Sequence, residues 1–272
     1  MSNFFKRLLT GLVYVAIIVL SVNLHHFVFY GVYLVIMLLS LREFYNLQYQ
    51  NKVNPQKVLG ITSAVLMFSI SYSMVFGLAE KNLFPIFLLL PLFIMAFELY
   101  RKLEKPFHNI SYTIVGLVYI ALPFSLLPFL AHSTTVANSI NANLVLSMFI
   151  LVWANDTFAY IWGMLIGKRR LFPRISPKKS VEGFVGGLVS TVLFSIVIAE
   201  FLVPEFTIIE WMGASIIIVL FATFGDLVES LLKRSLDVKD SSNLLPGHGG
   251  FLDRFDSMLF CIPAFYVYLS IV

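Results

Sequence analysis

The stretch "ESLLKRSLDVKDSSNLLPGHGGFLDRFDS", Glu229 to Ser257, holds nine charged residues although long apolar runs flank it on both sides. The whole chain of 272 residues is 59% hydrophobic and only 12% charged, with a mean hydropathy of +0.88. A soluble domain has about twice that charged fraction. Most of the chain therefore needs lipid as its solvent, and the composition predicts a polytopic membrane protein with its charges gathered into a few segments.

The apolar runs predict an all-α fold with about nine transmembrane helices. A helix that crosses a bilayer needs about 20 apolar residues, with a range of about 17–25. The segments that meet this length approximately are 8–24, 27–44, 57–78, 83–100, 110–132, 143–166, 182–203, 207–232 and 254–271.

The distribution of lysine and arginine orients these spans. If the connections alternate between two sides, the side with the N-terminus receives 18 basic residues and the other side receives Lys81 alone. Cytoplasmic loops carry the excess of basic residues, so the N-terminus is predicted in the cytoplasm and the C-terminus outside. The last two cytoplasmic loops, about 167–181 and 233–253, are the richest in polar groups.

Acidic residues within the spans point to a site. A charged residue at the bilayer centre costs ~2.5–3.5 kcal/mol on insertion scales, so such residues usually face a cavity or a partner. Asp226 and Glu229 share one helical face with Lys233, and Asp253 and Asp256 are three residues apart at the start of the last span.

Asp156 lies in the inner half of the sixth span, so three helices direct carboxylates to one cytoplasmic region. A set of ion pairs, such as Glu229 with Lys233, would also explain some of these acids. The excess of carboxylates suits Mg²⁺, which binds through one or two carboxylates and substrate phosphates. The chain has no Cys/His set for zinc.

The connecting segments add groups that favour phosphate. The "PGHGG" turn allows backbone N–H groups to approach an anion, although it could also be a tight turn between helices. The basic residues around it are Lys233, Arg234, Lys239 and Arg254.

A second stretch, "ISPKKSVEGFVGG", brings Lys178, Lys179 and Ser180 to the start of the seventh span, where a helix N-terminus attracts anions. Ser180 as an N-cap, and glycines at 183, 186 and 187 as helix-packing positions, are alternatives to a binding role.

The charged and glycine residues between Ser230 and Asp256 resemble the signature of the phosphatidate cytidylyltransferases, the CDP-diacylglycerol synthases. The stretches "NDTFAYIWGMLIGK" (Asn155–Lys168) and "SPKKSVEG" (Ser176–Gly183) are also similar to the family, with Ser180 where Thr is expected. The resemblance covers roughly residues 151–260. The signature positions are Ser230, Lys233, Arg234, Lys239, Asp240, Ser242, Leu245, Pro246, His248, Gly249, Gly250, Asp253, Arg254 and Asp256.

The resemblance implies that CTP and phosphatidate react to give CDP-diacylglycerol and diphosphate, with Mg²⁺, in phospholipid biosynthesis. It also implies a homodimer in the cell (inner) membrane, with a cytoplasm-facing cavity and no nucleic-acid partner. Residues 1–110 would then be N-terminal scaffold helices, and residues 111–272 the catalytic transmembrane region.

The resemblance also implies a role for each candidate residue. Asp226 and Asp256 would bind Mg²⁺, with Asp253 a ligand of a second cation or a support for the first. Asp156 would orient Lys179 or a metal-bound water. The remaining candidates would bind CTP or the lipid. The residues that would bind phosphates are Lys233, Arg234, Lys239, Arg254, His248, Gly249 and Gly250. The residues that would bind CTP or the lipid head group are Lys178, Lys179 and Ser180.

Three other functions use related parts. A CTP-dependent lipid kinase would need the same metal and basic residues. An ion-coupled transporter also carries intramembrane acids, but the polar residues here cluster toward one side instead of the midplane, and no inverted repeat is visible. A CDP-alcohol phosphotransferase would need an Asp-Gly…Ala-Arg…Gly…Asp…Asp run, which this sequence lacks.

Overall fold

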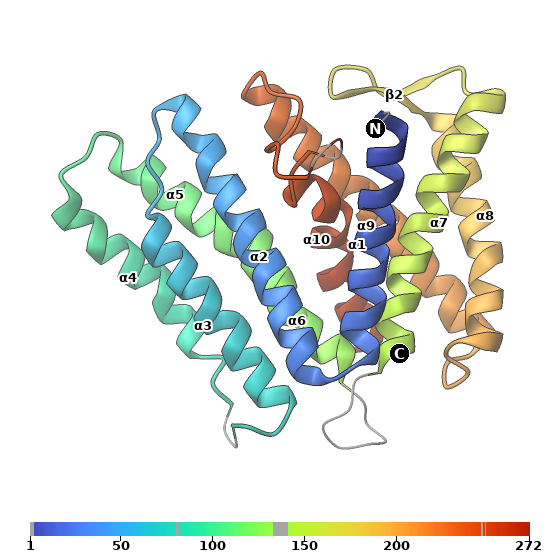
Figure 1. Cartoon of the computed structure of the whole chain (residues 1–272), viewed down its shortest axis with the longest axis horizontal. Helices are drawn as coiled ribbons and strands as arrows, with labels where there is room; N and C mark the ends of the chain where they lie inside the picture. Colours follow the sequence, from blue (N-terminus) through green and yellow to red (C-terminus); the bar gives the residue numbers. More distant parts are fainter. Residues whose placement is uncertain (1–2, 80–81, 133–140, 246, 248) are drawn as a thin grey trace. The chain divides into compact units, whose positions relative to one another are not determined.

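Over the residues that it describes, the computed structural model is mainly helical, with a short hairpin of two strands (Figure 1). It describes residues 3–79, 82–132, 141–245, 247 and 249–272. The elements are α1 (Asn3–Asn23), α2 (His26–Gln48), η1 (Tyr49–Asn51), α3 (Lys57–Val75), α4 (Ile86–Arg101), α5 (Pro106–Gly116), η2 (Leu117–Ala121), α6 (Leu122–Ala131), α7 (Ala142–Ile166), β1 (Arg170–Phe172), β2 (Ser176–Ser180), α8 (Val181–Phe201), α9 (Ile208–Ser235) and α10 (Leu252–Leu269).

Every predicted apolar segment coincides with a helix, and α5, η2 and α6 together form the fifth. Within the described ranges, six helices are long and apolar enough to cross a membrane: His26–Asn51, Lys57–Val75, Pro106–Ala131, Ala142–Ile166, Val181–Phe201 and Ile208–Ser235. The helix α4 has only 16 residues, and the first turns of α10 hold three charged residues. The chain is thus a multi-pass helical protein of membrane composition, and nine crossings stay a prediction.

The hairpin corrects one detail of the sequence prediction. Lys178 and Lys179 do not lie at the start of a helix, because Ser176–Ser180 forms β2, which pairs antiparallel with β1. Pro177 explains this locally, since proline disfavours the helical conformation of the preceding residue. The helix α8 begins only after Ser180, whose backbone is extended (φ −113°, ψ 154°).

The chain divides into two compact units. Unit 1 comprises residues 1–140 and 236–255, and unit 2 comprises residues 141–235 and 256–272. The boundary near residue 140 differs from the predicted functional division at residue 110, and that division stays a prediction. The two units are described separately below.

The core of unit 1 is aromatic and lies among α2, α3, α5 and α6. Tyr45 is fully buried, and its hydroxyl donates a hydrogen bond to the carbonyl of Thr113 at 2.9 Å. Two glycines make room for its ring, since a Cβ at Gly60 would lie 2.4 Å from the Tyr45 hydroxyl and one at Gly116 would lie 2.5 Å from a ring carbon. The small residues of α3 and α5 thus fix where α2 packs.

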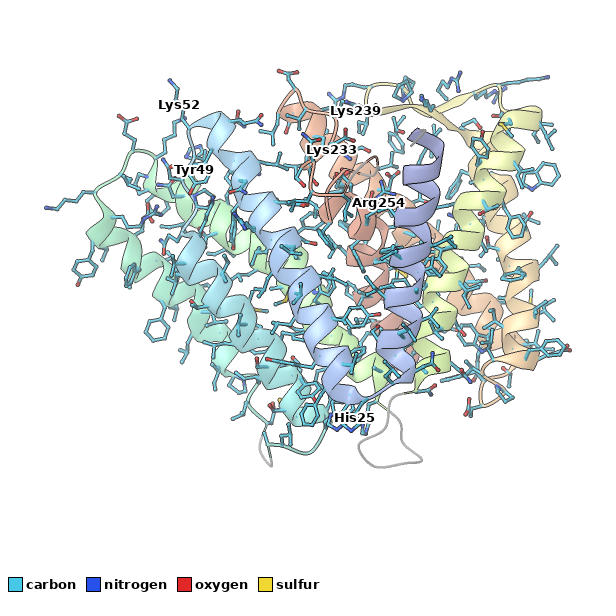
Figure 2. All side chains as sticks on the ribbon, viewed as in Figure 1. His25, Tyr49, Lys52, Lys233, Lys239 and Arg254 are labelled. Carbon is cyan, nitrogen blue, oxygen red and sulfur yellow. The ribbon has the colours of Figure 1, made fainter. Side chains whose placement is uncertain are left out.

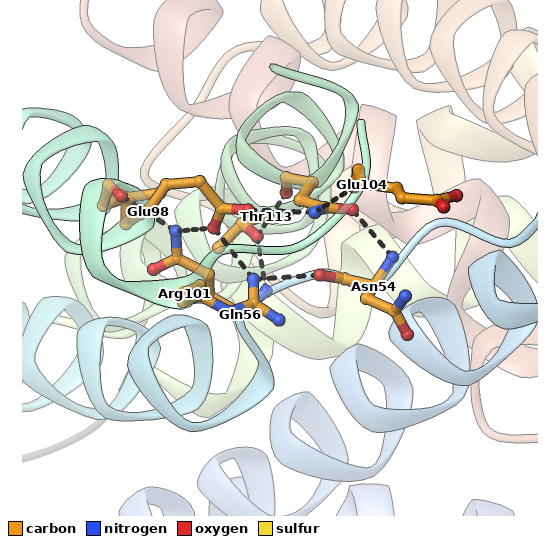
Figure 3. A network of polar contacts seen from close by, with 8 residues as sticks. Asn54, Gln56, Glu98, Arg101, Glu104 and Thr113 are labelled. Carbon is orange, nitrogen blue, oxygen red and sulfur yellow. Dashed lines mark hydrogen bonds and ion pairs between the residues drawn. The ribbon is translucent and has the colours of Figure 1, made fainter. Parts of the chain in front are cut away.

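A polar network at one end of unit 1 ties α4 and α5 to the segment before α3 (Figure 3). The buried carboxylate of Glu98 accepts hydrogen bonds from Gln56 at 2.6 Å, Arg101 at 2.9 Å and Asn109 at 2.9 Å. Asn109 in turn accepts from the backbone N–H of Asn54 at 2.8 Å. Buried polar groups are tolerated when they are hydrogen-bonded in this way.

In unit 2, small residues bring α7 and α8 into close contact. A Cβ at Gly187 would lie 2.9 Å from the Cβ of Ala159, and one at Gly183 would lie 3.1 Å from the Cα of Gly163. A Cβ at Gly186 would meet the Trp162 side chain at 2.3 Å. The helix-packing interpretation of the three glycines is therefore confirmed, as expected where membrane helices pack through small residues.

In unit 2, α9 and the part of α10 from Asp256 onward also approach closely. A Cβ at Gly225 would lie 2.4 Å from the backbone oxygen of Asp256, so the two backbones meet there. Near the other end of the pair, the Tyr268 hydroxyl donates to the carbonyl of Glu210 at 2.7 Å. This packing places Asp226 of α9 at the level of Asp256 of α10.

Candidate functional site

Unit 2 contains a cavity of about 440 Å³ among α7, the hairpin and the start of α8. The predicted residues Asp156, Lys178, Lys179 and Ser180 all line it. The sequence prediction did not include Arg170 of β1, which also lines the cavity and whose guanidinium donates to the carbonyl of Lys178 at 3.3 Å. One acidic residue and three basic residues thus share one hollow, which suits an anionic ligand.

Lys179 connects this hollow to α9, because its ammonium forms an ion pair with Asp226. Asp156 was predicted to orient Lys179 or a metal-bound water. The structure pairs Lys179 with Asp226, while Asp156 lines the same cavity, so its role stays a prediction.

Ser180 is the N-cap of α8. Its buried hydroxyl accepts the backbone N–H of Gly183 at 3.1 Å, which satisfies one of the unpaired donors at the helix start. Glu182 accepts the backbone N–H groups of Lys168 at 3.0 Å and Arg169 at 3.1 Å, and so fixes the end of α7 to the start of α8. The N-cap interpretation of Ser180 is confirmed, and its contact with a substrate stays a prediction.

The charges of α9 and α10 gather around Asp256. The charged groups near Asp256 include Asp226, Lys233 and Asp156. Lys233 also forms an ion pair with Glu229, which is fully buried. The pairing of Glu229 with Lys233, one of the two explanations considered for these acids, is therefore confirmed, while Asp226 and Asp256 lie together on neighbouring helices.

The donor set of Asp226 and Asp256 fits a hard divalent cation. Mg²⁺ is usually held by one or two carboxylates, waters and substrate phosphates instead of a cage of protein ligands. Among the residues that the structure describes, no three His, Cys, Asp or Glu side chains are grouped so as to hold a metal alone. The two carboxylates thus suit a cation that is shared with a substrate phosphate.

Asp253, the third predicted metal ligand, takes part in the segment 236–253 of unit 1, which follows α9, includes the start of α10 and is called the signature loop below. Its Oδ2 accepts hydrogen bonds from the backbone N–H of Gly250 at 2.7 Å and from the backbone N–H of Ser241 at 2.9 Å. The same oxygen lies 2.8 Å from the Ser241 hydroxyl. This oxygen therefore organises the loop, and metal binding by Asp253 stays a prediction.

The glycines of the loop have structural reasons of their own. Gly249 has φ +80°, which favours glycine, and a Cβ at Gly250 would lie 2.1 Å from the Ser241 hydroxyl. The N–H of Gly250 already donates to Asp253, so it is not directed at an external phosphate in this conformation. His248 lies outside the described residues, and the phosphate role of the turn stays a prediction.

The predicted basic residues divide between the units. Lys178, Lys179, Lys233 and Arg234 belong to unit 2, whereas Lys239 and Arg254 belong to unit 1. Lys239 and Arg254 are exposed, and Lys239 lies toward the same end of unit 1 as Lys52, opposite His25 (Figure 2). The sequence prediction puts Lys52 and Lys239 on the same side of the membrane, and their positions at one end of unit 1 agree with it.

Glu43 of α2 is a polar residue that the sequence prediction missed. It is only 2% exposed, and its carboxylate contacts the signature loop at several atoms. A signal was available, because Glu43 is an acid inside a predicted apolar segment, and such acids are candidates for functional sites.

A model of one protein family, described as the cytidylyltransferase family, matches residues 5–272. The chain belongs to the cytidylyltransferase family. The match contains every candidate site residue, including those of the signature loop and of the cavity. It also contains the N-terminal helices, so this family relationship extends well beyond residues 151–260.

Several proteins similar to this chain are named phosphatidate cytidylyltransferase. One from Staphylococcus haemolyticus (strain JCSC1435) is 34% identical over 235 residues, which are 85% of this chain and 86% of that protein. One from Staphylococcus aureus (strain COL) is 32% identical over 242 residues, 86% and 87% of the two chains. A match to one from Staphylococcus saprophyticus is 39% identical over 178 residues, 65% of each chain.

Proposed function

We propose that this cytidylyltransferase-family member is a phosphatidate cytidylyltransferase, which converts CTP and phosphatidate into CDP-diacylglycerol and diphosphate in phospholipid biosynthesis. The observation that carries the proposal is the family match over residues 5–272, together with relatives of that name at 32–34% identity over 85–86% of the chain. The cavity with its basic residues supports an anionic substrate.

The reaction joins two anions. A phosphate oxygen of phosphatidate attacks the α-phosphorus of CTP, a new P–O bond forms, and the bond from the α-phosphorus to the bridging oxygen breaks as diphosphate leaves. Lys178, Lys179 and Arg170 neutralise phosphate charge in the cavity as the two substrates approach. Positioning and electrostatic stabilisation supply most of the catalysis in such a transfer, and no protein nucleophile is required.

The proposed cofactor is Mg²⁺, with Asp226 and Asp256 as its protein ligands and Asp253 as a ligand of a second cation or a support for the first. When bound, the metal would offset the negative charge of the transferred phosphoryl group. In this account, Lys179 holds Asp226 in position through their ion pair, and Asp156 faces the same cavity.

The proposed location is the cell membrane, with nine crossings, the N-terminus in the cytoplasm and the site open to the cytoplasm. The 18-to-1 distribution of basic residues supports this orientation. A cytoplasmic site would also have access to CTP and to the membrane lipid. We further propose a homodimer, on the basis of the resemblance alone.

Product analysis tests the proposed function. Purified protein in detergent, given CTP, phosphatidate and Mg²⁺, should form CDP-diacylglycerol and diphosphate in equal amounts. Diacylglycerol, which lacks the phosphate, should not replace phosphatidate. If the protein is folded and forms no cytidine-containing lipid, the proposal is wrong.

A further inference from the structure

Glu43 of α2 holds the signature loop at four points. Its Oε1 accepts hydrogen bonds from the Ser242 hydroxyl at 2.6 Å and the Phe251 backbone N–H at 3.0 Å. Its Oε2 accepts the Leu252 backbone N–H at 2.9 Å and lies 3.0 Å from the Ser241 hydroxyl. All of these residues belong to unit 1, and the loop lies about 200 residues from Glu43 in the sequence.

The position of Glu43 suits a negative charge. Leu252 is the first residue of α10, and the first N–H groups of a helix have no partner within the helix. The carboxylate satisfies two of these N–H groups at the positive end of the helix dipole. Burial of a carboxylate costs much free energy unless it is hydrogen-bonded, and both oxygens of Glu43 are.

The loop is built closely around this carboxylate. A Cβ at Gly250 would lie 2.3 Å from Glu43 Oε2, so a larger residue at position 250 would displace the carboxylate. The Ser241 hydroxyl lies within hydrogen-bond distance of both Glu43 and Asp253, and its single hydrogen can be donated to either acid. Glu43 is thereby linked to Asp253, a candidate site residue.

We propose that Glu43 is a positioning residue, which fixes the described part of the signature loop at Ser241, Ser242 and Phe251 together with the start of α10, and so holds Asp253 and Arg254 in their working positions. Its effect on turnover rests on the proposed function. The role does not require Glu43 to touch a substrate or a metal. It gives the N-terminal region, predicted as a scaffold, a direct part in positioning the candidate residues of the signature loop.

Replacement of Glu43 by glutamine tests the proposal with little change in shape. Whichever oxygen becomes an NH₂ group, one backbone N–H, of Phe251 or of Leu252, then faces a donor in place of an acceptor. We expect turnover per folded protein to fall about 10- to 100-fold, the usual effect of losing an outer support of a site. Glu43→Asp, which keeps the charge but is shorter, should recover part of this loss.

Glu98→Gln is the matched control. Glu98 is another buried acid of unit 1 with three hydrogen-bond partners, but none of them belongs to the signature loop. Both substitutions should lower the thermal midpoint, and only Glu43→Gln should lower turnover per folded protein. Equal turnover in the two variants would overturn the positioning role.

Hydrogen exchange gives a readout that does not depend on the reaction. In Glu43→Gln, amides in peptides covering residues 241–253 should exchange at least about tenfold faster, because they lose the acceptor that holds them closed. Peptides of α4 and α5 should not change. Unchanged exchange in residues 241–253 would overturn the proposal even if the wild-type protein makes no CDP-diacylglycerol, so the two proposals fail separately.

Ser242→Ala is a second variant, in case Glu43→Gln does not fold. It removes one donor to Glu43 and leaves the carboxylate in place. We expect a smaller loss of turnover and faster exchange confined to the same loop. Wild-type exchange and wild-type turnover in Ser242→Ala would contradict a loop held through Glu43.

Discussion

At the scale of single residues, the proposed metal ligands Asp226 and Asp256 are both in unit 2. The two carboxylates lie on neighbouring helices where Gly225 lets the backbones meet. Lys179 pairs with Asp226, and Lys233 pairs with the buried Glu229. Carboxylates kept close together in this way are characteristic of functional sites.

Asp256→Asn tests this arrangement. The change removes one of two repelling charges at almost constant shape, so thermal stability should stay equal or increase, while turnover falls about 100-fold or more. The measurements are a thermal midpoint in detergent and the rate of diphosphate release. The exposed Glu205, in the turn before α9, offers the control Glu205→Gln, which should change neither.

A near-normal rate for Asp256→Asn with Mg²⁺ would show that Asp256 is not a metal ligand. A large loss of stability would instead show that its carboxylate is part of the packing between α9 and α10.

At the scale of elements, the pair α7 and α8 supports the cavity. Their close approach depends on Ala159, Gly163, Gly183 and Gly187, and the hairpin between them carries Lys178 and Lys179 into the hollow. Without these small residues the helices would stand further apart, and the cavity walls would separate. The lipid does not drive such helices together, so packing contacts must do so.

Gly187→Ala tests the importance of this contact. The new Cβ would lie 2.9 Å from the Ala159 Cβ, and overpacking typically costs about 1–3 kcal/mol. We expect a loss of stability of that size in denaturant titration in detergent. Gly31→Ala in α2 is the control, because a Cβ there meets nothing within 4 Å. Equal stability of the two variants would contradict the close-packing account.

The positions of most helices can be predicted from the sequence, because helices that face lipid are long, continuous apolar segments. Each predicted span coincides with a helix, and the pairing of Glu229 with Lys233 follows from helical spacing. The hairpin formed by β1 and β2 was not predicted, since neither the charge pattern nor the helix-capping rules identify strands of three to five residues. Glu43 was missed as well, because its partners lie about 200 residues away and only folding brings them together.

At the scale of the whole molecule, the prediction of nine membrane crossings includes helices of different lengths. The helix α4 is about 24 Å long at 1.5 Å per residue, less than the ~30 Å hydrocarbon thickness. Six other helices of the described chain meet the usual length and hydropathy. The nine-span prediction therefore depends on short helices such as α4 crossing as well.

Cysteine labelling across α4 tests the nine-span topology. Asn82 and Lys102 flank this helix with exposed side chains, and the native Cys261 is fully buried and would be replaced by alanine. In intact cells, a membrane-impermeant thiol reagent should label Asn82→Cys, and Lys102→Cys should be labelled only after the membrane is opened. Labelling of both positions from one side would show that α4 does not cross.

The central claim is that the α-phosphorus of CTP is transferred to phosphatidate. The alternative with most of the same parts, a CTP-dependent lipid kinase, would transfer the γ-phosphorus to a lipid alcohol. Purified protein should be given phosphatidate and Mg²⁺ with CTP labelled at either the α or the γ position. The account predicts that the α label enters the lipid fraction and the γ label leaves in diphosphate. Entry of the γ label into lipid, or no label in lipid from either position, would contradict it.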